Sequence, residues 1–223
     1  MSPLEVYVRL MLYFTIFAVA GYLIEALSSL LGMFSRPKKR KLSNRGFLFG
    51  PYLPIYGFGG VIMATLSNYI PKDNFVLTFL VAMTMGVTLE YVTSFVLEKI
   101  FHLRWWDYSQ TDKFNINGRI CLRNALKFGV GGLLFVYLVL PGIRNAIDAL
   151  PWGLQATTAF IMTAVYLVDF VISSYANLQV KNMEEIGKII GDQTTEIKKN
   201  AKKVIKTVLG EKRAKRASRK KRH

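Results

Sequence analysis

The sequence predicts an all-α membrane protein: a polytopic helical bundle with five transmembrane helices, an external N-terminus and an amphipathic cytoplasmic helix near the C-terminus. Three observations predict this class. The chain of 223 residues is 52% hydrophobic, and its 30 Lys and Arg and 14 Asp and Glu are segregated from long apolar runs. Five of those runs approach the roughly 20 residues that a helix needs to cross a hydrocarbon core about 30 Å thick. A soluble domain would interleave charged and apolar residues instead.

The expected spans lie at residues 10–34, 52–70, 75–97, 120–140 and 154–175. The first is too long for a cleaved signal peptide, so we expect it to stay in the protein. The second is the least regular, since its opening GPYLPIYGFGG contains two prolines and several glycines. Proline removes a backbone donor, so the alternative for this segment is a broken or re-entrant element that lines a cavity.

Basic residues divide unevenly between the two sides of this five-span arrangement. The connection after the first span holds six Lys and Arg and the connection after the third holds four, whereas the opposite side keeps only Arg9, Lys72 and Arg144. Short basic loops stay in the cytoplasm. The N-terminus is therefore expected outside and the C-terminal tail inside, in the cell membrane, and four or six spans would break this agreement.

Three parts of the chain are expected: a transmembrane helical domain at 1–176, an amphipathic cytoplasmic helix at 177–210 and a basic disordered tail at 211–223. Between Ile186 and Val208, apolar residues recur every three or four positions, which is typical of an interfacial or self-associating helix. We therefore expect a homo-oligomer as one partner state. The tail EKRAKRASRKKRH favours contact with anionic lipid. Nucleic acid is the weaker alternative, because a basic run without a folded reading module is poor evidence for it.

Acidic residues inside the predicted spans are the first candidates for function: Glu25, Glu90 and Asp169. Each unpaired charge costs about 3 kcal/mol in the bilayer, so these groups must be paired, protonated or hydrated. Arg119, Arg123 and Lys127 follow one another at i, i+4 steps and are expected at the same depth. The charges either hold helices together or line a polar cavity open to the cytoplasm. We favour the cavity, because intramembrane ionisable groups usually mark a ligand or ion path.

The connection HLRWWDYSQTDKFNING at 102–118 is rich in aromatic and polar residues. Its tryptophans and Tyr108 suit the headgroup zone, while Asp107 and Asn117 could cap helices or close over a ligand. Cys121 follows this connection, and packing is the favoured role for it over nucleophilic catalysis. One cysteine and two histidines allow neither a disulfide framework nor a catalytic zinc site, so no metal or cofactor is expected.

Two blocks of sequence, NRGFLFGPYLPIYGFGG at 44–60 and LEYVTSFVLEKIFHLRWWDYSQTDKFNINGRICL at 89–122, together with GYLIEA around Glu25, resemble the CmpB-like "putative ABC-transporter permease" family of bacterial membrane proteins. The resemblance covers most of residues 20–132. It implies a permease that works with a separate ATPase subunit, and this chain has no GxxxxGK[ST] phosphate loop of its own. The family pattern picks out Glu25, Asn44, Arg45, Gly46, Tyr56, Glu90, Trp106, Asp107, Tyr108, Asn117, Gly118 and Arg119.

Without the two glycines, and with Arg123 and Asp169 added from their positions in the spans, these residues form the candidate ligand-binding set. The leading hypothesis is a permease-like transport protein that binds a polar or charged small molecule or a lipid headgroup in an inner-leaflet cavity. One alternative is an inner-leaflet lipid-modifying enzyme with Asp107 or Glu90 as general base, for which no recognised catalytic spacing exists. The other is a non-catalytic scaffold that recruits a partner through its tail.

Overall fold

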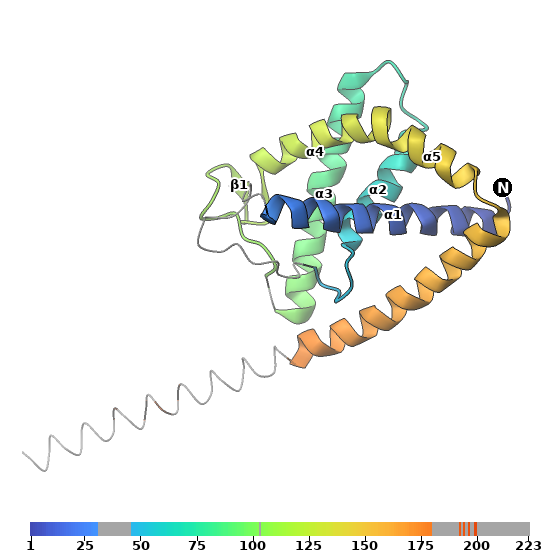
Figure 1. Cartoon of the computed structure of the whole chain (residues 1–223). Helices are drawn as coiled ribbons and strands as arrows, with labels where there is room; N and C mark the ends of the chain where they lie inside the picture. The colour runs from blue at the N-terminus through green and yellow to red at the C-terminus, as the bar shows by residue number, and fades with distance from the viewer. Residues whose placement is uncertain are drawn as a thin grey trace, which may run out of the picture. The chain divides into compact units, whose positions relative to one another are not determined.

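The computed structural model describes residues 1–30, 46–102, 104–179, 192, 194, 196 and 199 (Figure 1). Its contacts divide the chain into two units, Met1–Ala176 and Asn177–His223. In the second unit, residues 177–179 and the separate described positions are helical. The expected amphipathic helix at 177–210 and the basic tail at 211–223 lie almost entirely outside the described residues. The account below therefore concerns the first unit.

The described part of the first unit consists of helices and one two-stranded hairpin. In chain order the elements are α1 Pro3–Leu30, α2 Pro54–Leu66, α3 Phe75–Phe101, β1 Asn115–Ile116, β2 Ile120–Cys121, α4 Leu122–Leu134, the π-helical segment η2 Phe135–Val139 and α5 Leu140–Asp148. A last helix follows at Trp152–Gln179. Figure 1 shows α4, η2 and α5 as one continuous curved helix. The structure confirms the predicted all-helical class.

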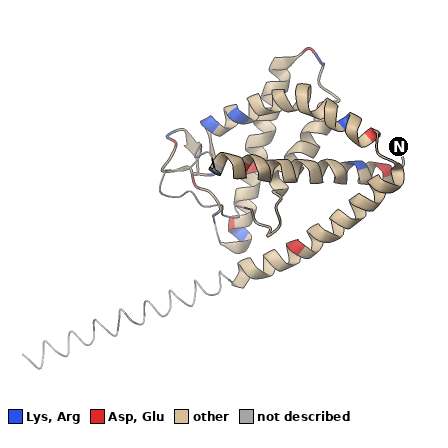
Figure 2. Ribbon diagram, in the orientation of Figure 1, with Lys and Arg blue, Asp and Glu red and all other residues tan. Residues whose placement is uncertain are grey.

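Four helices in the described residues are long and apolar enough to cross a membrane: Pro3–Ser28, Phe75–Phe101, Leu122–Asp148 and Trp152–Gln179. They correspond to the first, third, fourth and fifth expected spans. At 1.5 Å per residue each is about 40 Å long, which exceeds the hydrocarbon thickness of about 30 Å. Charged residues lie mainly near the helix ends and in the connections (Figure 2).

The second expected span, at 52–70, is represented by the shorter apolar helix α2, which has 13 residues. It is about 20 Å long and cannot cross the hydrocarbon core as a helix alone. Its prolines explain the shortening. Leu53, which precedes Pro54, is extended with φ −117° and ψ 104°, because a residue before proline avoids the α region. The helix can therefore begin only at Pro54, and residues 46–53 reach it as a non-helical segment.

Hydrogen bonds join both the start and the end of α2 to neighbouring helices. The Leu53 N–H donates to the Ala18 carbonyl of α1 at 2.9 Å. At the other end, the Arg144 guanidinium of α5 donates to the Ala64 carbonyl at 3.0 Å and to the Asn68 side chain at 2.9 Å. These bonds satisfy backbone groups where α2 ends. Residues 46–66 are therefore fixed among helices.

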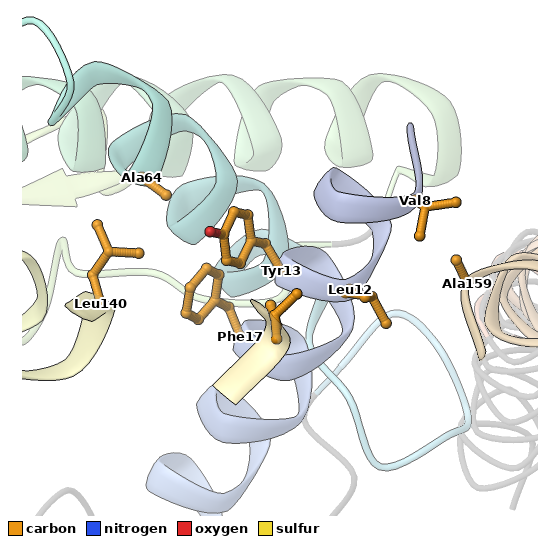
Figure 3. Packing of buried hydrophobic residues seen from close by; sticks show 8 residues of the cluster. Val8, Leu12, Tyr13, Phe17, Ala64, Leu140 and Ala159 are labelled. Atoms are coloured by element: carbon orange, nitrogen blue, oxygen red, sulfur yellow. The ribbon is translucent and has the colours of Figure 1, made fainter. Parts of the chain in front are cut away.

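A hydrophobic cluster joins α1, α2, α5 and the helix at Trp152–Gln179 (Figure 3). Its buried members are Val8, Leu12, Tyr13, Phe17, Ala64, Leu140, Ile147 and Ala159. Many other large apolar side chains are exposed on the helices, including Leu23, Leu167 and Val171. A soluble monomer rarely exposes so much contiguous apolar surface, whereas a lipid-facing helix does.

Candidate functional site

The most deeply buried acidic side chain in the described residues is Glu90, which lies near the middle of α3 and is 6% exposed. The Tyr108 hydroxyl donates to Glu90 Oε1 at 2.8 Å, and Asn124 Nδ2 lies 3.5 Å from the same oxygen. Asn124 Nδ2 also donates to the Tyr108 hydroxyl at 2.7 Å. The second carboxylate oxygen, Glu90 Oε2, is buried and has no hydrogen-bond partner among the described residues. Three separate segments therefore converge on one carboxylate.

Glu25 of α1 lies close to this group. The Tyr56 hydroxyl of α2 donates to Glu25 Oε1 at 3.1 Å, and Tyr56 is within electrostatic range of both Glu25 and Glu90. Tyr108 is likewise within range of Tyr56 and Glu90. We call Glu25, Tyr56, Glu90, Tyr108 and Asn124 the Glu90 cluster.

Gly21 explains how Tyr56 comes so close to α1. Gly21 and Glu25 are four residues apart and so lie on one face of the helix. A Cβ atom at position 21 would overlap the Tyr56 ring. The glycine leaves room for the ring to lie against the backbone of α1, so that its hydroxyl lies within hydrogen-bonding distance of Glu25.

The β1–β2 hairpin positions the aromatic residues of the preceding connection. Its three-residue loop at 117–119 begins with Asn117 and Gly118, whose φ angles of 54° and 66° are both left-handed, and the Arg119 N–H closes this turn by donating to the Ile116 carbonyl at 3.0 Å. The Gly118 carbonyl accepts the Tyr108 N–H at 2.8 Å, and the Arg119 carbonyl accepts Trp106 Nε1 at 2.9 Å. The hairpin thus holds the backbone from which the Tyr108 side chain reaches Glu90.

Burial and the neighbouring Glu90 carboxylate raise the pKa of Tyr108 above its ordinary value. Its hydroxyl therefore stays protonated and acts as a donor at physiological pH. Cys121 of β2 is also buried, and loss of solvation raises the pKa of its thiol. A raised pKa opposes the thiolate form that nucleophilic catalysis needs.

A second polar network surrounds Arg119. This guanidinium donates to Glu98 Oε2 at 2.8 Å and to the Ser94 hydroxyl at 3.1 Å, and it lies over the rings of Tyr91 and Phe95. Each acceptor and ring comes from the last turns of α3. Arg119 therefore fastens the hairpin to the end of α3.

Arg104 continues this network. Its Nε lies 3.2 Å from Glu98 Oε2, and its Nη1 lies 2.9 Å from Asp107 Oδ2. Asp107 Oδ1 also accepts the Ser109 N–H at 2.9 Å. This backbone hydrogen bond, and then Arg104, lower the pKa of Asp107 to about 2. Asp107 is consequently a weak base that is already engaged.

The ion pairs differ from those that the sequence predicts. Arg119 pairs with Glu98, and the exposed Arg123 lies 3.5 Å from Asp112. In the described ranges, none of the three intramembrane acids forms an ion pair with a basic side chain. Asn117 instead donates to the Tyr91 hydroxyl at 3.1 Å, while Asn44 and Arg45 lie outside the described residues. Direct ion pairs between these acids and Arg119 or Arg123 are therefore not seen in this part of the chain.

Asp169 has a different environment from the Glu90 cluster. Its carboxylate accepts the Phe49 N–H at 3.0 Å, the Gly50 N–H at 2.8 Å, the Ser173 hydroxyl at 2.7 Å and the Tyr52 hydroxyl. A shallow, open groove of about 530 Å³ lies alongside, lined by Phe49, Ala164, Val165, Val168, Asp169 and Ile172. Asp169 thus fastens the non-helical segment before α2 to the last long helix.

The sequence signals identified some of these residues and missed others. Ser94 and Glu98 lie on the helical face of Glu90 at i+4 and i+8, which their spacing indicates. Asn-Gly at 117–118 is a strong hairpin signal, yet the hairpin itself was not predicted. No signal marks Asn124 or Tyr52, because their contacts join segments far apart in the chain.

A family model described as "Putative ABC-transporter type IV" matches residues 12–174, which include the Glu90 cluster and Asp169. The chain belongs to this family. No curated protein and no solved structure gives a significant match. Family membership and the four long apolar helices together identify a multi-pass membrane protein related to ABC transporters, in contact with the lipid bilayer.

Proposed function

We propose that this protein is a permease-like transport component that binds a polar or charged small molecule, or a lipid headgroup, at the Glu90 cluster. One observation carries the proposal: within the described part of the chain, Glu90 Oε2 is buried and has no hydrogen-bond partner. Such a group costs about 1–3 kcal/mol or more, and a purely structural carboxylate would gain by pairing it. A ligand that binds there would remove the cost. Intramembrane ionisable groups commonly mark ligand or ion paths.

Our proposal for the topology has five crossings, the second made by residues 46–66. Asp169, which binds the start of this stretch, lies about 25 Å along the helix that begins at Trp152. Arg144, which binds its end, lies one turn before the end of α5. The stretch therefore covers most of the membrane depth. Non-helical backbone is tolerated there when protein buries it and satisfies its donors, as Asp169 does at Phe49 and Gly50.

With this topology the basic connections face the cytoplasm of the cell, the N-terminus lies outside and the C-terminal tail lies inside. Single cysteines at Ser2 and Ser218, introduced after Cys121→Ala, test it with a membrane-impermeant thiol reagent on intact cells. We expect labelling at position 2 alone, because an odd number of crossings places the two ends on opposite sides. Labelling of both positions, or of neither, would place both ends on one side, contradict five crossings and support an even number.

Membership of the family favours an ATPase partner. Native mass spectrometry of the protein extracted gently from its own membrane tests both the ligand and this partner. We expect a bound small molecule that disappears in Glu90→Gln but remains in Glu5→Gln, and a stoichiometric ATP-binding chain. The spectrum also reports homo-oligomers and anionic lipids retained by the tail. A bare chain, without ligand or partner, would contradict the proposal.

The lipid-modifying enzyme has less support. Its general base would have to be Asp107 or Glu90, and Asp107 is held by Arg104 and the Ser109 N–H with a lowered pKa. Glu90 Oε1 already accepts the Tyr108 hydroxyl, and no recognised catalytic spacing accompanies it. We therefore favour binding and transport.

A further inference from the structure

We propose that the ligand of the Glu90 cluster is a monovalent cation with N–H donors, that is, a protonated amine. The inference rests on the proposed function, because it names the chemical class that the same site would recognise. Three features of the cluster carry it: its charge balance, the direction of its hydrogen bonds and its aromatic surroundings.

The charge balance of the cluster favours a positive ligand. Two carboxylates, Glu25 and Glu90, lie within electrostatic range of each other, and among the described residues Lys127 is the basic group in range of Glu90. Lys127 Nζ lies 3.5 Å from Asn124 Oδ1, and among the described residues neither carboxylate has a basic partner within ion-pair distance. With both acids ionised the group is short of one positive charge. Burial makes that deficit more costly than at a surface, so one univalent cation would complete the site.

The hydrogen bonds around Glu90 favour a donor ligand. Both protein donors to this carboxylate, the Tyr108 hydroxyl and Asn124 Nδ2, are directed at Oε1. Oε2 is an acceptor in a residue more than nine-tenths buried, and no donor from the residues that the structure describes reaches it. An ammonium group offers N–H donors and positive charge together, and such charge-assisted hydrogen bonds are the stronger kind. At Oε2, an anion would face the negatively charged oxygen of a carboxylate and could not accept a hydrogen bond from it.

The remaining surroundings separate an amine from a metal ion or an anion. No group of three or more His, Cys, Asp or Glu side chains that could hold a metal ion occurs in the part of the chain that the structure describes. Arg104 and Arg119, the nearby guanidinium groups, are engaged by Glu98 and Asp107. The phenol rings of Tyr56 and Tyr108 offer aromatic faces of the kind that bind ammonium ions.

Calorimetric titration of the purified full-length protein in lipid nanodiscs tests the inference. The probes are n-butylammonium, tetramethylammonium, butanol and butyrate, which separate charge from N–H donation. We expect n-butylammonium to bind at pH 7, tetramethylammonium to bind at least tenfold more weakly, and butanol and butyrate not to bind. Glu90→Gln should weaken the binding of n-butylammonium at least tenfold. The matched change Glu5→Gln, about 30 Å from Glu25 along α1, should leave this binding unchanged.

Lys127→Gln provides a second variant that does not depend on the folding of Glu90→Gln. Because this change removes the internal ammonium group, it should tighten the binding of n-butylammonium severalfold. The binding of an anion would instead become weaker. Unchanged n-butylammonium binding in both variants would overturn the inference, as would no binding to the wild type. Glu90-dependent binding of butanol or butyrate would overturn it as well, yet leave the proposed ligand site standing. The proposed function itself is decided separately, by the mass spectrum of the native protein.

Discussion

The Tyr108 hydroxyl donates to Glu90 Oε1 at 2.8 Å, and this single bond joins the connection before the hairpin to the middle of α3. The backbone of Tyr108 is in turn fixed by the Gly118 carbonyl in the hairpin turn. A change in the hairpin can therefore reach the buried carboxylate through one side chain. This link makes the hairpin a part of the site and not only an anchor in the headgroup zone.

Tyr108→Phe should destabilise the protein, because it removes the shorter of the two donors to Glu90 and leaves a buried carboxylate less satisfied. Hydrogen bonds to charged groups contribute about 1.5–3 kcal/mol, and we expect a loss of that size in the free energy of unfolding. Tyr91→Phe is the matched control, since in the described ranges its hydroxyl accepts a single hydrogen bond, from Asn117, at an exposed position. Chemical unfolding in mixed micelles measures both. Equal losses in the two variants would contradict the role given to Tyr108.

Asp169→Asn should loosen the non-helical segment before α2. One carboxamide oxygen cannot replace two carboxylate oxygens that together accept the Phe49 and Gly50 N–H groups, so at least one of these two hydrogen bonds is lost, although the Phe49 N–H also donates to the Ser173 hydroxyl at 3.2 Å. We expect faster amide hydrogen exchange in this segment, measured by mass spectrometry in nanodiscs. Asp73→Asn, in the exposed turn before α3, is the control. Unchanged exchange at 49 and 50 would show that other contacts hold the segment.

The four long helices could be predicted because each is an uninterrupted apolar run longer than the membrane is thick, a property of the local sequence. The second span was harder, because Pro51 and Pro54 stop the helix while the composition stays apolar. Its stability depends on donors and acceptors in Ala18, Arg144 and Asp169, which lie far away in the chain. The proline signal indicated a break, but not what would satisfy it.

The site was predictable in its acids and less so in their partners. Glu25 and Glu90 stand out because carboxylates are rare in apolar runs. The basic residues were expected on one helical face, but α4 begins only at Leu122, after two extended residues of β2. Arg119 therefore lies outside the helix, and its i, i+4 relation to Arg123 does not apply. The hairpin directs Arg119 to Glu98 instead.

The contribution of Asp107 to stability should depend on pH in the acid range. Its pKa falls from an ordinary 3.8 to about 2 in the folded protein, first through the Ser109 N–H and then through Arg104. A group whose pKa is lower in the folded state contributes its full stabilisation at pH values above its unfolded-state pKa. That stabilisation is lost as the pH falls through the folded-state pKa. The difference in melting temperature between wild type and Asp107→Asn should therefore be constant above about pH 5 and shrink between pH 4 and 2.

Arg104→Gln supplies the control for this pH dependence. It removes the ionic partner of Asp107 and leaves the hydrogen bond from Ser109, which contributes more to the shift. Melting of this variant should keep part of the acid dependence. A wild-type to Asp107→Asn difference that stays constant down to pH 2 would show that Asp107 does not titrate as described.

The close packing of α3 against α4 gives a matched pair of glycine variants. A Cβ atom at Gly132 would overlap the Cβ of Ala82, whereas a Cβ atom at Gly131 meets nothing within 4 Å. Small residues allow membrane helices to approach closely, and their packing supplies much of the association energy. Gly132→Ala should therefore destabilise the protein by about 1–3 kcal/mol. Gly131→Ala should be neutral or stabilise by up to about 1 kcal/mol, through higher helix propensity. Unfolding in mixed micelles measures the free energy of unfolding of both variants. If Gly131→Ala lost as much stability as Gly132→Ala, close packing of α3 against α4 would not be the reason that position 132 needs a glycine.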